Sequence, residues 1–357
     1  MTAVFVLVVG TRFLLPLLIP RYPLPAILAC LVVDGLDQTI FQAFGYDPPG
    51  YQGYDKAMDV YYLAIAYLAT RRNWTQLGAF DVSRFLYFYR LVGVLAFEVF
   101  QMRAMLLVFA NTFEYFFIAY ETVRTRWDPR RLSLSGWVAV AAAIWVCVKL
   151  PQEYWIHVAQ LDMTDTLRDH AWAPWLLGGL LLALAVVVWF VVLPRTPEPD
   201  HPLRLAADPL PEEMDTAAEQ AAWRAGSSRL WSLLTFEKVV LVGLLSVIFS
   251  QSLPGLHVSK LELFVGVAVL IVVNTAIVIA AARRQVSFES LFVTFLVRIG
   301  VNVALVFVAR IVLGPNDLNV GHTLFFVLLL SLLTSMHDRY QPVYVARVVR
   351  ERQGTST

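Results

Sequence analysis

Residues 176–192 read LLGGLLLALAVVVWFVV, a stretch without a single charged side chain. With its apolar flanks, residues 173–194, it would extend about 30 Å as a helix, which matches the thickness of a bilayer's hydrocarbon core. Because no water is available in lipid, the backbone groups of such a segment must bond within the segment. The sequence therefore predicts a transmembrane helix here.

Ten further windows share this apolar character, although those at the start of the chain are shorter or more polar. They lie at residues 3–20, 23–44, 55–70, 77–100, 103–122, 133–150, 236–254, 260–282, 286–313 and 319–336. The first lacks a basic start and a small-residue cleavage site, so we expect it to be retained as a span. We therefore predict an all-α, polytopic transmembrane helical bundle of about 11 spans.

The composition of the 357 residues supports this fold class. The chain is 58% hydrophobic and 15% charged, with a mean hydropathy of +0.63, which is too apolar for one water-soluble core. The net charge is only +1, and no basic cluster is interleaved with aromatics, which excludes nucleic acid as a partner. The cations are 24 arginines and 4 lysines, a usage typical of high-GC bacteria, so we expect a bacterial cytoplasmic (inner) membrane protein.

The loops between the windows predict the orientation. Alternate loops hold most of the arginines: Arg21, Arg71, Arg72, Arg124, Arg126, Arg130, Arg131, Arg195, Arg204, Arg224, Arg229, Arg283, Arg284 and those from Arg339 to Arg352. The other loops, such as residues 45–56 and 151–170, carry few cations among several acids. Since basic loops stay in the cytoplasm, we expect the N-terminus outside and the C-terminus in the cytoplasm.

One long polar segment divides the chain. Its start is rich in proline and acids, as in a linker, and its second half has the composition of an amphipathic helix. The predicted parts are an N-terminal bundle at 1–194 with an outer interfacial segment at 151–172, a cytoplasmic linker at 195–235, a C-terminal bundle at 236–340 and a basic cytoplasmic tail at 341–357.

Ionisable residues concentrate in the first five windows, where each costs at least about 2.5–3.5 kcal/mol at the centre of a helix. They are Arg12, Asp34, Asp37, Asp59, Asp81, Arg84, Arg90, Glu98, Arg103, Glu114 and Glu121. Seven acids face four arginines, so three carboxylates must be protonated, solvated by a water-filled cavity or balanced by a bound cation. The later windows offer little at depth beyond Arg298, Asn274 and Asn302.

Helical spacing refines this set. Asp55 and Asp59 are one turn apart, and Arg103, Glu114 and Glu121 return to one face of a continuous fifth span. The substrate- or ion-binding candidates are Asp34, Asp37, Asp55, Asp59, Glu98 and Glu114. The charge-balancing candidates are Arg12, Arg84, Arg90 and Arg103. Glu153 and His157 are acid/base candidates at the outer face.

Three functions fit these residues. The first is a transporter-like or channel-like protein whose outward-facing acidic cavity takes a cation or cationic solute, coupled to protons. The second is a membrane-embedded enzyme acting on a lipid or lipid-linked substrate, with a divalent cation as cofactor held by Asp37, Asp55 and Asp59. The third is a non-catalytic assembly or scaffold partner, in which the charges form a structural ion-pair network.

Overall fold

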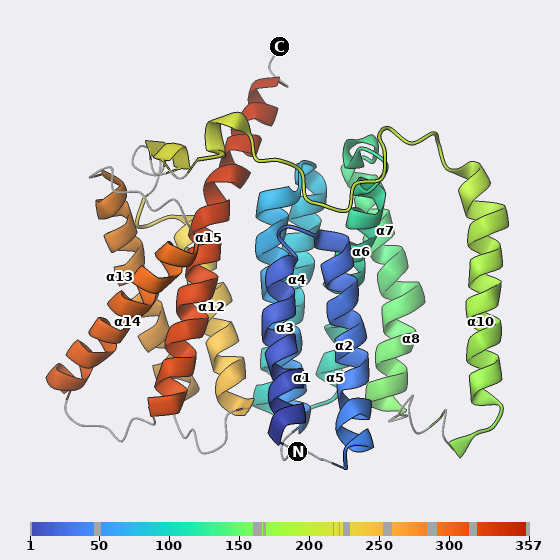
Figure 1. The fold of residues 1–357 in the computed structure, drawn as a ribbon, viewed down its shortest axis with the longest axis horizontal. Coiled ribbons are helices and arrows are strands. Elements are labelled where there is room, and N and C mark those ends of the chain that lie inside the picture. Colours follow the sequence, from blue (N-terminus) through green and yellow to red (C-terminus); the bar gives the residue numbers. More distant parts are fainter. Residues whose placement is uncertain are drawn as a thin grey trace.

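The computed structural model describes residues 2–45, 51–159, 166, 169–216, 218–220, 222–223, 229–252, 259–283, 291–313 and 320–354. This described part of the chain is helical and contains no β-strand. Most of the long helices lie side by side with their axes roughly parallel (Figure 1). The start of the first helix and the end of the last helix lie at opposite ends of the bundle.

The helices fall into two sets separated by the linker. The first set is α1 (Thr2–Leu14), η1 (Leu15–Leu18), α2 (Pro23–Ala43), α3 (Tyr51–Asn73), α4 (Leu77–Phe100), α5 (Ala104–Val108), α6 (Thr112–Arg124), η2 (Pro129–Arg131), α7 (Leu134–Ile144), η3 (Trp145–Lys149), α8 (Leu150–Glu153), η4 (Tyr154–Val158), α10 (Ala173–Val187), η5 (Val188–Val192) and η6 (Leu193–Arg195). The linker contains η7 (Glu212–Met214), and the second set is α12 (Leu233–Ser252), α13 (Lys260–Arg283), α14 (Leu291–Leu313) and α15 (Val320–Gly354).

Five of these helical segments are long and apolar enough to cross a membrane. They are Pro23–Ala43, Leu134–Ile156, Ala173–Val191, Leu233–Ser250 and Lys260–Arg283. Two shorter apolar helices are Val4–Leu18 and Val293–Phe307. This confirms the prediction of a helical protein with several membrane-crossing segments. The remaining predicted windows also lie in helices, but α3, α4, α6 and α15 carry more charge or are shorter than a self-sufficient span.

The prediction that residues 103–122 form a single helix is wrong. It is divided into α5 and α6 by non-helical residues at Phe109 and Asn111. Arg103 precedes α5 and is exposed, whereas Glu114 lies in the first turn of α6, so the predicted stripe of three charges along one face does not form. The break lies beside Gly93 of α4, where a Cβ atom would overlap Phe109 Cβ and lie 2.6 Å from its Cγ.

Helix α3 forms the centre of the molecule. Its residues 57, 58 and 60–71 are buried, and it packs against α2 and α4 on one side and α12 and α15 on the other. Tyr67 stacks on Tyr87 of α4 with a ring separation of 4.6 Å, and its hydroxyl donates to Glu237 of α12. The two helix sets therefore share a common core at α3. Helix α10 is at the opposite extreme, because it stands at the edge of the bundle with none of its apolar window buried (Figure 1).

The linker lies at the end of the bundle where α15 ends (Figure 1). The N–H groups of Asp200 and Arg204 donate to the carbonyls of Arg126 and Thr125, at 2.9 Å each, and the Ala207 N–H donates to the Arg21 carbonyl at 2.8 Å. Loops that the sequence placed on one side of the membrane are thus in contact with each other.

The Asp200 carboxylate also holds the linker against the loop after α6. Asp200 is paired with Arg131 and accepts a hydrogen bond from the Asp128 N–H at 2.8 Å. Hydrogen bonds from Arg130 hold the pKa of Asp128 below its ordinary value, so this loop keeps its charge at neutral pH.

We predict that Gly93→Ala destabilises the protein. The added methyl group must push α4 away from the α5–α6 break, and a misfit of this kind costs about 1–3 kcal/mol. Thermal unfolding of the purified protein in detergent measures the effect. Gly266→Ala in α13 is the matched control, because nothing lies within 4 Å of its Cβ position. Equal midpoints for the two variants would contradict the close approach at Gly93.

Candidate functional site

Four aspartates and one arginine converge between α1, α2 and α3. Arg12, near the end of α1, pairs through Nη2 with Asp34 and through Nη1 with Asp37, both of α2. The same two nitrogens reach Asp59 Oδ1 at 2.9 Å and Asp55 Oδ1 at 2.8 Å on α3. We call these five residues the Arg12 site.

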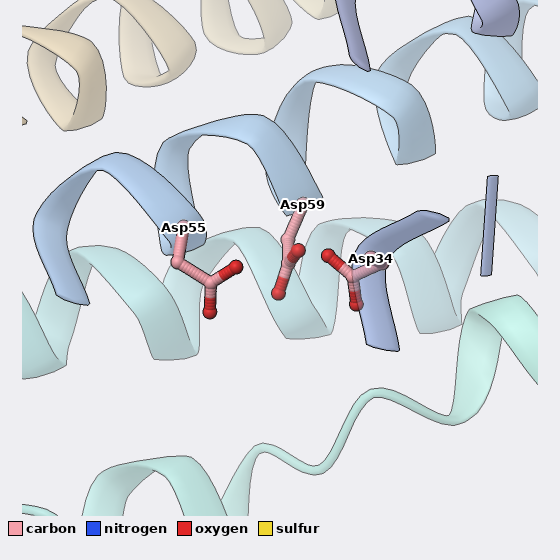
Figure 2. A group of neighbouring side chains, drawn as sticks. All are labelled: Asp34, Asp55 and Asp59. Carbon is pink, nitrogen blue, oxygen red and sulfur yellow. The ribbon is translucent and has the colours of Figure 1, made fainter. Parts of the chain in front are cut away.

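The sequence positions explain why the four carboxylates meet. Asp34 and Asp37 are three residues apart on α2, and Asp55 and Asp59 are four apart on α3, so each pair projects from one helix face. Helix α2 packs on α3, which turns the two faces toward each other. In Figure 2 the carboxylates of Asp55 and Asp59 hang from one helix and face that of Asp34 on its neighbour.

The Arg12 site is a mixture of buried and accessible groups. Arg12 and Asp37 are buried, whereas the side chains of Asp34, Asp55 and Asp59 are 25%, 33% and 21% exposed to solvent. These three can each place an oxygen within 4.8 Å of the others. The accessible side of the site is therefore lined by carboxylate oxygens, and the guanidinium lies behind them.

The Arg12 site has more negative than positive charge. All four aspartates pair with Arg12, and these four carboxylates, when ionised, sum with the one guanidinium to −3. A low-dielectric interior does not tolerate that sum. The negative charge of the site therefore has to be balanced by protons or cations, or solvated by water that reaches the three partly exposed aspartates.

The residues would also fit a divalent metal. Oxygens of Asp34, Asp55 and Asp59 lie within 4.8 Å of one another, about the span that hard cations such as Ca²⁺ bridge with ligands at 2.3–2.6 Å. This set contains Asp34 where the sequence had suggested Asp37, because the Asp37 carboxylate is buried against Arg12 Nη1. The guanidinium contacts one oxygen of each of the three, so a metal would compete with Arg12.

A second layer of polar groups adjoins the site. Glu114 at the start of α6 is buried, accepts a hydrogen bond from the Tyr62 hydroxyl and accepts another from Asn111 Nδ2 at 3.1 Å. Its charge acts on Asp34 and Asp59. Glu114 therefore borders the Arg12 site without joining its ion pairs.

The helix break brings in a further pair. Glu153 on α8 accepts from the Asn111 N–H at 3.3 Å and lies 3.4 Å from Lys149, and both side chains are buried. The predicted partner His157 lies in η4, but its side chain is outside the described residues. Glu153 thus holds the start of α6 and positions Glu114 indirectly.

The other predicted charges lie apart from the aspartates. Arg84 pairs with Asp81 at 3.1 Å on an exposed face of α4, and Arg103 is exposed. Arg90 is buried and donates to the Phe109 carbonyl at 3.2 Å, at the helix break. Glu98 is half-buried near the end of α4, and its carbonyl accepts from Lys260 at 3.0 Å. None of these arginines forms an ion pair with the Arg12 site among the described residues.

Sequence reasoning missed a second buried polar network. It joins Arg71 of α3, Glu237 and Lys238 of α12, Arg298 of α14 and Asp338 of α15. Only Arg298 stood out in the sequence. Lys238 lies near the start of one apolar window, Asp338 lies two residues past the end of another, and Arg71 was assigned to a loop. Spacing alone carries no signal that these borders pack together.

Comparisons with known proteins give no relative for this arrangement: the sequence matches no family model and no curated protein, and no solved structure matches the fold. The function therefore has to be argued from the site.

We predict that Arg12→Met destabilises the protein strongly. It leaves four carboxylates facing one another without their shared cation, and removing one partner of a buried ion pair costs about 3–5 kcal/mol. Adding Asp59→Asn should recover part of the loss, because it removes one repelling charge. Unfolding free energies of the single and double variants test this, and Arg103→Met is the exposed control. Further loss on adding Asp59→Asn would contradict the shared-arginine site.

Proposed function

We propose that the protein is a transporter-like or channel-like bundle that binds a cation or cationic solute at the Arg12 site and couples this binding to protons. The observation that supports it most is the sharing of one guanidinium among four carboxylates, three of them partly accessible. Such a site carries excess negative charge, which a bound cation or proton can reduce.

The proposed topology has about 11 spans in the bacterial cytoplasmic membrane, with the N-terminus outside and the C-terminus in the cytoplasm. The contacts among Arg21, the loop at 125–131 and the linker support this topology. It is also supported by the start of α1 and the end of α15 lying at opposite ends of the bundle (Figure 1). In this orientation Asp55, in the second turn of α3, lies toward the outer face. The acidic cavity would then receive its ligand from outside.

Arg12 gives this proposal a mechanism. Its two terminal nitrogens already contact one oxygen of each aspartate, so an arriving cation has to share or displace the guanidinium. The guanidinium stays charged at any physiological pH, whereas carboxylates can be protonated. Protonation of an aspartate therefore frees Arg12 for the remaining carboxylates and weakens cation binding. Cation and proton compete for the same oxygens, which is the requirement for coupling.

We predict that Asp37→Asn or Asp59→Asn abolishes cation-dependent proton movement and leaves the protein folded. Purified protein in liposomes with an internal pH-sensitive dye is given gradients of Na⁺, K⁺, Mg²⁺ or a small organic amine. The wild type should show a flux that falls to the level of empty liposomes in either variant. Asp81→Asn is the control, since Asp81 is exposed and pairs with Arg84. Unchanged flux in Asp37→Asn and Asp59→Asn would count against the proposal.

A membrane-embedded, metal-dependent enzyme for a lipid or lipid-linked substrate is the second candidate. The approach of Asp34, Asp55 and Asp59 to within 4.8 Å favours it, because carboxylates from two neighbouring helices suit Mg²⁺ or Ca²⁺. A bound divalent cation would reduce the surplus from −3 to −1 and offer a Lewis acid to a phosphate of the substrate. Glu114, which accepts from Tyr62 of α3, and Glu153 are buried carboxylates that could do acid/base work.

Titration with divalent cations separates the two candidates. For the enzyme, we predict that millimolar Mg²⁺ or Ca²⁺ raises the unfolding midpoint of the wild type and that Na⁺ or K⁺ at equal ionic strength does not. Asp55→Asn should remove the increase, while Asp128→Asn in the loop after α6 should keep it. A midpoint that responds equally to every salt would exclude a divalent site here.

A further inference from the structure

The buried network around Asp338 is short of negative charge. Asp338 accepts from Lys238 Nζ at 2.7 Å and pairs with Arg298, while Glu237 pairs with Arg71. Three cations thus face two carboxylates. Lys238, Arg298, Arg71 and Asp338 are all buried.

Some donors in this network have no acceptor. Among the described residues, the Nε and Nη1 groups of Arg298 and the Nε group of Arg71 are buried without a hydrogen-bond partner. Leaving a charged donor unpaired in the interior costs more than about 1–3 kcal/mol. An anion near this network would supply the missing charge.

A cavity of about 170 Å³ opens beside the network. Its polar walls are Arg229, Ser232, Thr235, Lys238, Thr275 and Asp338. Apolar side chains from α13 and α15, such as Val278 and Val345, complete it. It is built around the start of α12 near the linker, at the same end of the bundle as the end of α15 (Figure 1).

The walls favour an anion over a cation. Among the described lining residues the carboxylate is that of Asp338, which is already shared by Lys238 and Arg298, so its charge is more than balanced. Lys238 and the exposed Arg229 face the cavity, and the first turn of α12, with Ser232 capping the Thr235 N–H at 3.2 Å, adds the positive end of a 20-residue helix. The Ser232 hydroxyl can donate to a phosphate oxygen, whereas the Thr275 hydroxyl donates to the Ile271 carbonyl at 2.7 Å.

We propose that this cavity is a binding site for the phosphate group of an amphiphilic ligand, with Lys238 and Arg229 on the phosphate and the apolar wall of α13 and α15 on the adjoining carbon chain. The chemistry is shared by the headgroup of an anionic phospholipid and by a soluble organic phosphate. The site is separate from the Arg12 site in residues and in charge, and it does not depend on the function proposed for that site.

The test uses the full-length protein in detergent and in phosphatidylcholine nanodiscs. The probes are inorganic phosphate, glycerol 3-phosphate and phosphatidic acid, with binding followed by the unfolding midpoint and by native mass spectrometry. We expect at least one phosphate probe to bind. Binding of glycerol 3-phosphate would indicate a soluble ligand, and binding of phosphatidic acid alone would indicate a lipid.

Variants assign the binding to the cavity. Arg229→Gln and Lys238→Met should each lower the affinity for the probe about tenfold or more, which is the loss expected for one charge-assisted hydrogen bond. Arg283→Gln, an exposed arginine at the end of α13, is the control and should leave affinity unchanged. If Lys238→Met does not fold, the affinity of the Arg229→Gln variant decides whether the probe binds in the cavity, because Arg229 is exposed. Failure of every probe to bind, or equal weakening by Arg229→Gln and Arg283→Gln, would overturn the proposal.

Discussion

One guanidinium surrounded by four carboxylates is the constraint on which the N-terminal half depends. Arg12 holds α1 against α2 and α3, because its partners are two residues on each of those helices. The same arrangement leaves the helices joined by an interaction that a proton or a metal ion can alter. Stability and ligand binding therefore draw on the same charges, and a ligand that changes the charge balance also changes how tightly these three helices are held.

Helix α3 connects this region to the other polar network. Asp55 and Asp59 at its beginning belong to the Arg12 site, and Arg71 near its end pairs with Glu237 of α12. Between them lies a continuous run of buried apolar and aromatic residues. Asp59 and Arg71 are therefore twelve residues apart on one helix, a rise of about 18 Å, and an apolar core separates the two charged regions.

The sequence was informative where a single physical rule decides the outcome. Long apolar windows must be helical in lipid, and the described residues of these windows are helical apart from their ends and the break between α5 and α6. The aspartates at positions 34, 37, 55 and 59 were singled out because charge in such windows is costly, and the structure brings all four together. The use of one arginine for all of them was not predictable, since the count of charges says nothing of which helices are neighbours.

The errors arose where tertiary contacts override local pattern. Extrapolating 100° per residue through 103–122 assumed an unbroken helix, although Asn111–Thr112, a pair typical of a helix start, stands inside that window. Lys238 and Asp338 lie near the borders of two predicted windows, where the local sequence carries no sign of burial. Their burial depends on α12, α13, α14 and α15 meeting, which is a long-range property that hydropathy does not encode.

The central position of α3 has a consequence for biogenesis. Its charges at both ends find partners on other helices, and those of Arg71 lie on α12, more than 160 residues later in the chain. When α3 leaves the ribosome, that partner has not been made, so α3 on its own is a poor substrate for insertion into lipid. Stable integration of α3 therefore has to wait for α12, so the central helix is secured later than the more apolar helices that precede α12 in the chain.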